Sequence, residues 1–373
     1  MARIDAFLQM GREQGCSDIH LTVGLPPLVR QDGQLTQLAA NELSAADTQA
    51  LVLEIVPSHL SEQLDRRGSV DFSYAIEGLG RFRINVYRQH YGLAAVCRVV
   101  PEQVPRLANL GLPPVVARMT ALRTGLLLVT GGSGTGKSTT LAAMIAEINE
   151  TRNLNIITLE DPVEFVHPSH KCLVVQRELG THVPSFSAGL RAALRQDPDV
   201  ILVGELRDAE TISLAVEASE TGHLVLATMH TRGAHPTIHR LVDAFPTEAQ
   251  AQIRHTLADN LKAVLSQELV RTADGRGRRA VVEVLVLTSA VAQYVREGKT
   301  HQIPSAIATG RRVGMQLMDQ ALLTMVRAGD IDPDEAFLRA TDKREFLPYV
   351  TRADLRQVAE MQSARMPVPE EAS

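Results

Sequence analysis

Short runs of apolar residues alternate with helical patterns in the second part of the chain. The runs occupy residues 126–129, 156–159, 200–203 and 224–227. Short runs of this kind are typical of strands that a parallel sheet buries on both faces. Between them, apolar residues recur at helical spacing, as at Leu141, Met144, Ile145 and Ile148. The pattern predicts an α/β domain over residues 115–289.

The first hundred residues show shorter stretches in which apolar and polar residues alternate. Strands are expected at 18–23, 28–30, 35–38, 70–76, 81–87 and 93–100, and helices at 4–14 and 44–64. Pro57 interrupts the second helical pattern. The dipeptide Asp32-Gly33 between the second and third strands indicates a hairpin. Residues 1–100 are therefore predicted to form a small α+β domain.

The remaining segments are assigned from their turn signals and periodicity. Residues 101–114, with several prolines and a glycine, are expected to form a linker. A long helix is predicted from residue 246 to 269, with Thr247 and Gln250 as a capping box, and a basic hairpin turn at 271–279. Residues 290–362 are expected to be mainly helical, and residues 363–373 to form a disordered tail.

Composition narrows the class of protein. A chain of 373 residues with 45% hydrophobic residues is long enough for two domains. A formal net charge of −5 disfavours a general nucleic-acid binder. The chain shows neither a signal peptide nor 18 consecutive apolar residues, and Cys16, Cys97 and Cys172 form no metal or disulfide motif. A cytoplasmic location is therefore expected.

The most specific motif is a complete G-x-x-x-x-G-K-[ST] sequence, formed by Gly131, Gly136, Lys137 and Ser138. A predicted strand precedes it and a predicted helix follows, which is the order that builds a phosphate cradle. Glycines let the backbone N–H groups point inward, Lys137 is expected at the β- and γ-phosphates, and Ser138 at Mg²⁺. The predicted nucleotide-binding residues are Gly131, Gly132, Ser133, Gly134, Thr135, Gly136, Lys137, Ser138 and Thr139. The motif predicts binding and hydrolysis of a nucleoside triphosphate.

Acidic residues follow two of the predicted strands. Glu205 ends the strand at 200–203, which is the Walker B pattern, so it is expected to support Mg²⁺ together with Ser138. Glu160, Asp161 and Glu164 follow the strand at 156–159. The carboxyl ends of parallel strands face the ligand crevice, so either Glu164 or Glu160 is a candidate to align the attacking water.

Two histidines flank the strand at 224–227. His230 lies at its carboxyl end and is a candidate to sense the γ-phosphate, whereas His223 lies at the opposite end and is a weaker candidate. Arg81, Arg83 and Arg98 lie on predicted strands of the N-terminal domain. On sequence alone, these three arginines are ordinary surface cations.

Together these motifs resemble the type IV pilus retraction ATPases, the PilT-type twitching-motility motors of the type II/IV secretion ATPase superfamily. The resemblance extends over about residues 1–350 and rests on five ordered motifs. They are an N-terminal opening at 17–20, arginine-bearing strands at 81–85 and 96–101, an acidic box at 160–167, a Walker B region at 194–208 and a histidine box at 221–231. Residues 296–303 and 314–322 also resemble the retraction branch.

The resemblance implies a fold and a set of roles. It implies a PAS-like N-terminal domain joined to a RecA-like P-loop core with a helical C-terminal region. Glu164 would activate water, Glu205 would support Mg²⁺, and His230 would contact ATP. Arg81, Arg83 and Arg98 would be brought to the phosphates. Six subunits would form a ring in the cytoplasm, beneath an inner-membrane platform protein, and would return pilin to the membrane; a second retraction ATPase is an optional partner.

Two departures from the family pattern leave alternatives open. The P-loop reads Gly-Gly-Ser-Gly-Thr-Gly instead of the usual Gly-Pro-Thr-Gly-Ser-Gly, which keeps every backbone requirement. In the retraction signature at 290–296, Ala292 replaces an arginine and Gln293 an asparagine, which suggests altered coupling. The alternatives are a pilus or type II secretion assembly ATPase, an accessory ring subunit and, with least support, a nucleic-acid translocase.

Overall fold

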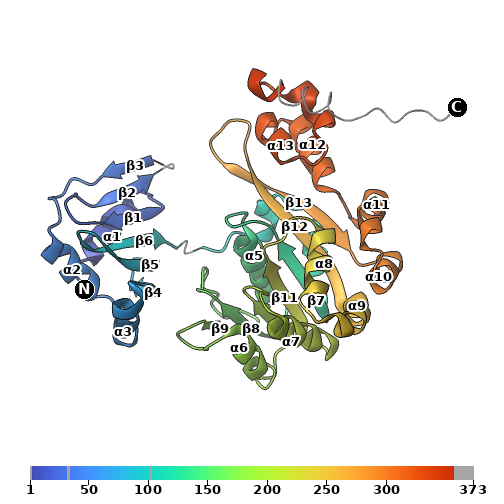
Figure 1. The fold of residues 1–373 in the computed structure, drawn as a ribbon, viewed down its shortest axis with the longest axis horizontal. Coiled ribbons are helices and arrows are strands. Elements are labelled where there is room, and N and C mark those ends of the chain that lie inside the picture. Colours follow the sequence, from blue (N-terminus) through green and yellow to red (C-terminus); the bar gives the residue numbers. More distant parts are fainter. Residues whose placement is uncertain (1, 32–33, 101–102, 357–373) are drawn as a thin grey trace. The chain divides into compact units, whose positions relative to one another are not determined.

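The computed structural model describes residues 2–31, 34–100 and 103–356 (Figure 1). Its contacts divide the chain into two units, Met1–Val104 with Pro162–Val166 and Pro105–Asp161 with His167–Ser373. Within the described residues, no helix is long and apolar enough to cross a membrane. The finer boundaries expected at residues 101–114, 289 and 362 stay predictions, and the predicted tail at 363–373 lies outside the described residues.

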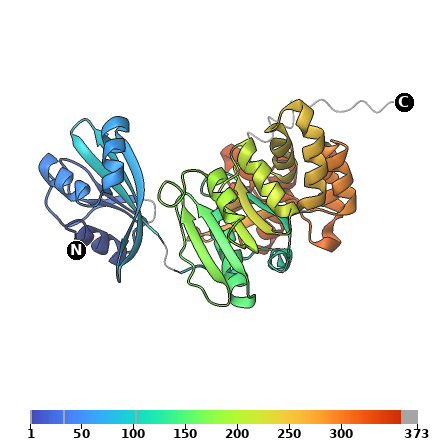
Figure 2. The same cartoon turned by 90° about the horizontal axis from the view of Figure 1, so that it is seen from below.

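The N-terminal unit is a six-stranded antiparallel sheet in the order β3-β2-β1-β6-β5-β4. Burial alternates along β5, where Phe82, Ile84 and Val86 are fully buried, so one face of the sheet carries the core and the helices cover it (Figure 2). The α+β prediction is confirmed. The elements are α1 (Asp5–Glu13), β1 (Asp18–Leu21), β2 (Leu28–Gln31), β3 (Gln34–Gln37), α2 (Ala45–Leu53), α3 (Ser58–Arg67), β4 (Ser69–Ile76), β5 (Gly80–Gln89) and β6 (Gly92–Val99).

The second unit is built on a seven-stranded sheet in the order β13-β12-β7-β11-β10-β8-β9. All neighbours pair in parallel except β13, which forms an antiparallel hairpin with β12. Every predicted apolar run forms a strand of this sheet. The strands are β7 (Gly125–Thr130), β8 (Asn155–Glu160), β9 (Leu173–Glu178), β10 (Val200–Val203), β11 (Leu224–Met229), β12 (Leu261–Arg271) and β13 (Arg278–Val286).

Each face of this sheet packs against helices, which explains why the strand sequences lack polar alternation. Leu127 and Val129 of β7 belong to an apolar cluster on one face of the sheet, whereas Leu126 and Leu128 belong to an apolar cluster on the opposite face. The first face is covered by α4 (Pro114–Met119) and α5 (Lys137–Thr151). The second is covered by α6 (Phe186–Ala193), α7 (Ala209–Glu220), α8 (Ala234–Asp243), α9 (Thr247–Asn260), α10 (Ser289–Arg296) and α11 (Ile303–Thr309).

The C-terminal helices pack on the far part of the β12–β13 hairpin, which extends beyond the sheet toward them (Figure 1). Val270 and Val281 of the hairpin share an apolar cluster with α12 (Met318–Ala328), α13 (Pro333–Arg339) and a 3₁₀ segment at Lys343–Tyr349. The C-terminal region is therefore joined to the sheet through these two strands.

The helix predicted over 246–269 is confirmed from Thr247 to Asn260, where α9 ends, and is wrong beyond it, because the chain continues as β12. Nearly every residue of β12 is buried between β7 and β13, and its apolar spacing fits a helix as well as a buried strand. The predicted capping box is also wrong. Pro246 is the N-cap of α9, and the amide of Gln250 donates to the carbonyl of Phe245 at 3.2 Å.

The altered signature at 290–296 lies on α10. Ala292 is 7% exposed and faces the apolar cluster of the second sheet face, whereas Gln293 is exposed and donates to Glu297. An arginine at position 292 would place a charge among apolar side chains unless the helix shifted. The substitution therefore changes packing under α10 and is not simply the loss of an exposed charge.

His167 is a buried residue in the loop between β8 and β9. Asn149 of α5 holds this loop, donating to the carbonyl of Pro168 at 2.8 Å and accepting from the N–H of His170 at 3.1 Å. His167 is 8% exposed, and burial lowers its pKa from 6.5 to about 4. The folded protein therefore keeps this imidazole neutral under mildly acidic conditions.

The first prediction concerns the pH dependence of stability. The contribution of His167 is complete above its unfolded pKa of 6.5 and is lost as pH falls toward the folded value of about 4. Because the unfolded state takes up the proton first, lowering the pH from about 7 to about 4.5 should cost about 2–3 kcal/mol through this group. Urea unfolding of the native chain and of His167→Gln measures this difference. An equal loss in both proteins would contradict the assignment.

Candidate active site

Four predicted site segments meet at one edge of the parallel sheet. The P-loop follows β7, Glu160 ends β8, Glu205 follows β10, and His230 follows β11. The register places Val203 of β10 opposite Leu159 of β8 on one side and Ala227 of β11 on the other. The carboxyl ends of these strands are therefore aligned, which is where open α/β sheets bind ligands.

Two positions of the P-loop, Gly131 and Gly136, require glycine. Gly131 and Gly136 have φ values of 144° and 84°. A Cβ atom on Gly131 would lie 2.3 Å from the carbonyl oxygen of Gln267, and one on Gly136 would lie 2.9 Å from the Gln267 side chain. The loop leads directly into α5, whose first N–H groups have no partner within the helix. This arrangement fits a phosphate group.

Lys137 closes the cradle from within. Its side chain is 8% exposed, and Nζ donates to the carbonyl oxygens of Gly131 at 3.0 Å and Gly132 at 2.8 Å. Ser138 and Thr139 follow on the first turn of α5, with Ser138 exposed. These groups fit a nucleotide phosphate with Mg²⁺, for which the hydroxyl of Ser138 is a suitable ligand.

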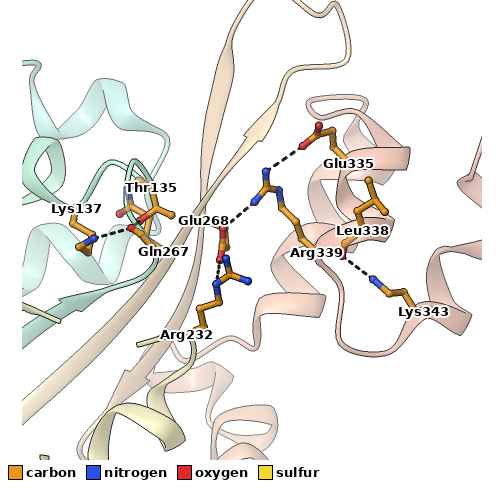
Figure 3. A network of polar contacts seen from close by, with 10 residues as sticks. Thr135, Lys137, Arg232, Gln267, Glu268, Glu335, Leu338, Arg339 and Lys343 are labelled. Carbon is orange, nitrogen blue, oxygen red and sulfur yellow. Dashed lines mark hydrogen bonds and ion pairs between the residues drawn. The ribbon is translucent and has the colours of Figure 1, made fainter. Parts of the chain in front are cut away.

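Gln267 of β12 holds the P-loop, and the sequence analysis missed it. The side chain is 1% exposed. Figure 3 shows Gln267 beside Thr135, to whose carbonyl oxygen its Nε2 donates at 2.7 Å. Its Oε1 accepts from Oγ1 of Thr140 at 2.8 Å. The one sequence signal was a polar residue within a largely apolar run, and the wrong helical prediction concealed it.

Glu205 and His230 lie together on neighbouring strand ends. His230 Nε2 is 3.3 Å from Glu205 Oε1, and Arg207 Nε donates to Glu205 Oε2 at 2.7 Å. The side chain of Glu205 is 16% exposed, whereas that of His230 is 46% exposed. A cavity of about 560 Å³ includes these residues, with Asp208, Thr231 and Arg240 also in its lining. The sequence predicted Glu205 and His230, and the structure brings them together.

The acidic turn after β8 contains two carboxylates in different settings. Oε1 of Glu160 accepts from Oγ1 of Thr158 at 2.6 Å and from Nε2 of Gln176 at 3.1 Å. Glu164 is exposed, and its neighbours Val163 and Phe165 are buried. Its segment groups with the N-terminal unit. Glu160 therefore has a structural task, which favours Glu164 as the carboxylate that acts on water.

The three predicted arginines lie on adjacent strands of the N-terminal unit. Arg81 and Arg83 belong to β5, and Arg98 of β6 is directly opposite Arg83. Nε of Arg98 donates to Oδ1 of Asp18 at 2.8 Å. Burial alone would raise the pKa of Asp18, but hydrogen bonds from Arg98 and Ser17 and the charge of Arg98 lower it below its usual value. Arg98 therefore has a partner within this unit, and its contact with phosphate stays a prediction.

Comparison with known proteins identifies the family. Residues 3–338 match the family described as type II/IV secretion system protein. The chain belongs to this family. The chain is 43% identical over 343 residues to the type IV pilus retraction ATPase PilT of Pseudomonas aeruginosa. The match covers 92% of this chain and 99% of that protein. This chain is 46% identical over 314 residues to a twitching motility protein of Neisseria gonorrhoeae, covering 84% of each.

A solved structure supports the same assignment for this secretion system protein. The crystal structure of the pilus retraction motor PilT with bound ADP superposes with a TM-score of 0.86 and 42% identity, over 92% of this chain and 98% of that one. The predicted PilT-type resemblance and the fold of an N-terminal domain with a RecA-like core are confirmed. The prediction of an ATPase is likewise confirmed, since the P-loop is complete and a close structural relative holds ADP.

The second prediction tests the support of the P-loop in this secretion ATPase. Gln267→Leu removes both hydrogen bonds and leaves the buried partners at Thr135 and Thr140 unsatisfied. We expect a loss of about 1–3 kcal/mol in the free energy of unfolding, and ADP affinity about tenfold weaker because the cradle is no longer held. Isothermal titration and urea unfolding measure both effects.

Gln250→Leu is the matched control, because Gln250 makes one hydrogen bond on α9. It should leave ADP affinity unchanged. If folded Gln267→Leu binds ADP as tightly as the native chain, β12 does not maintain the cradle.

Proposed function

We propose that this chain is an ATP-hydrolysing motor that powers type IV pilus retraction. It works as a homo-hexamer at the cytoplasmic face of the inner membrane, through a platform protein, alone or with a second retraction ATPase, and acts on pilin indirectly. One observation carries the proposal. A preformed P-loop cradle and a Glu205–His230 pair lie at the same sheet edge of a chain that matches a retraction ATPase over nearly the whole length of both proteins.

In this proposal, the second unit binds and orients the triphosphate. The P-loop amides and Lys137 hold the β- and γ-phosphates, and binding draws Nζ of Lys137 away from the loop carbonyls that it now contacts. Ser138 and Glu205 are the residues that would hold Mg²⁺, which neutralises charge on the phosphates when it is bound. His230 lies exposed beside Glu205 in the lining of the cavity described above, and it would contact the bound nucleotide.

Hydrolysis also requires a base and further positive charge. Glu164 takes the proton of the attacking water, since Glu160 is engaged by Thr158 and Gln176. Arg81 and Arg83 bring positive charge from the N-terminal domain, while Arg98 keeps its bond to Asp18 until a phosphate competes for it. Arginines on a separate domain can be supplied by a neighbouring subunit, and head-to-tail interfaces close into rings. A closed ring is therefore expected, and the resemblance to the retraction ATPases implies that it has six subunits.

The third prediction separates the two carboxylates of the acidic turn. Glu164→Gln should retain ATP binding and slow hydrolysis by about 10² or more, the scale typical of losing a general base. Glu160→Gln should slow hydrolysis far less, because an amide oxygen can still accept from Thr158 and Gln176. Phosphate release assays decide between them. A crippled Glu160→Gln with a nearly normal Glu164→Gln would reverse the assignment.

The fourth prediction tests the direction of pilus movement. Cells that lack this chain should carry excess pili and fail to twitch, because polymerised pilin is no longer returned to the membrane. Expression of the native chain should restore twitching, and expression of Lys137→Ala should not, because the lysine charge is needed at the phosphates. Pilus number and twitching are scored in the same strains. Bald cells would identify an assembly ATPase instead.

A further inference from the structure

Two arginines from distant parts of the second unit converge on one carboxylate beside the P-loop (Figure 3). Glu268 of β12 is 3.5 Å from Nε of Arg232 through Oε1, and its Oε2 accepts from Nη1 of Arg339 at 3.0 Å. Arg339 also contacts Glu335 at 3.2 Å on α13. We call Arg232, Glu268 and Arg339 the arginine–carboxylate cluster. None of these residues belongs to the P-loop, Walker B or histidine motifs.

Arg232 reaches the cradle from the turn after β11. A Cβ atom built on Gly132 would lie 3.7 Å from Nη2 of Arg232 and 3.9 Å from its Nε. The carbonyl of the same Gly132 binds Lys137 at 2.8 Å. The neighbouring backbone is fixed, since the N–H of Gly233 donates to Oγ of Ser266 on β12 at 2.7 Å. The guanidinium and the P-loop lysine therefore adjoin the same glycine.

The contacts of Glu268 are unequal. The side chain of Glu268 is 12% exposed, so a carboxylate there needs a cation. Arg339, 34% exposed, supplies one through a hydrogen bond, whereas Arg232 is 78% exposed and makes only the longer contact. Arg232 can therefore leave Glu268 without stranding a buried charge, because Arg339 remains.

We propose that Arg232 leaves Glu268 to bind the terminal phosphate of ATP, and that Arg339 determines how readily it does so. The proposal rests on ATP binding at the P-loop but not on pilus retraction. An arginine that forks onto a phosphate forms charge-assisted hydrogen bonds, and positive charge at the γ-phosphate stabilises the transition state. Arg232 supplies this charge within one subunit, in addition to the arginines of the N-terminal domain.

The same cluster connects nucleotide binding to the C-terminal helices. Gln267 and Glu268 are consecutive on β12, and their side chains contact the P-loop and α13 respectively. Arg339 is the last residue of α13, and Lys343 beyond it donates to the carbonyl of Leu338 at 2.8 Å. When Arg232 leaves, Glu268 depends on Arg339 alone. ATP should therefore strengthen the attachment of α13 to β12, and by reciprocity that attachment should favour ATP.

The direct test compares a triphosphate with a diphosphate. Arg232→Gln should weaken binding of a non-hydrolysable ATP analogue with Mg²⁺ about tenfold, while ADP affinity changes less than about twofold, because only the analogue carries the terminal phosphate. The control is Arg344→Gln, which removes an exposed arginine paired with Asp342. It should change neither affinity. Equal effects on both nucleotides, or none, would overturn the proposal.

A second comparison tests the role of Arg339. Arg339→Gln leaves Arg232 as the cation for Glu268, so analogue affinity should fall several-fold, by up to about tenfold, with ADP affinity retained. Adding Glu268→Gln should restore analogue binding, since a neutral amide no longer holds Arg232. Failure of this rescue in a variant with native thermal unfolding would show that Arg339 is only structural. Equal loss of affinity for both nucleotides in Arg339→Gln would also overturn this role, because the effect would then not depend on the terminal phosphate.

Discussion

The hydrogen bonds between Gln267 and the P-loop are the contact on which the nucleotide site depends. A loop that turns its N–H groups inward exposes carbonyl groups on its other side, and those must be satisfied. The side-chain amide of Gln267 donates to the carbonyl oxygen of Thr135 in the loop and accepts from the hydroxyl of Thr140 on α5. The contact requires β12 to lie against the loop, so close that Gly131 and Gly136 have no space for a side chain. The glycines of the motif therefore permit both phosphate access and this packing.

Strand β12 then has two further consequences. Its pairing with β13 produces the hairpin that carries the C-terminal helices, whose apolar cluster includes Val270 and Val281. Glu268, the residue after Gln267 on β12, contacts arginines from the turn after β11 and from α13. Gln267, which contacts the P-loop, is thus followed directly by Glu268, which contacts α13 of the C-terminal region. That short path is a physical route by which nucleotide state can alter the position of those helices.

The features that could be predicted from the sequence are those set by residues close together along the chain. The P-loop, the strand-end acids and His230 were predictable because each is a local motif after a buried strand, and parallel strands align their carboxyl ends. The strand β12 was missed because a run buried on both faces has no distinctive period. Gln267 and the Arg232–Glu268–Arg339 contacts could not be predicted, since partners such as Thr140 and Gln267 are separated by 127 residues. The replacement of an arginine by Ala292 suggested altered coupling, and its burial against the core could not be predicted because it depends on how α10 packs.

The most direct measurement is a crystal structure of this chain with a non-hydrolysable ATP analogue and Mg²⁺. The account predicts that Lys137 and Arg232 both turn to the terminal phosphate, leaving the loop carbonyls and Glu268. Gln267 should keep its bonds to Thr135 and Thr140, and Arg339 should keep its bond to Glu268. A phosphate-bound cradle in which Gln267 has moved away and Arg232 still contacts Glu268 would contradict the account.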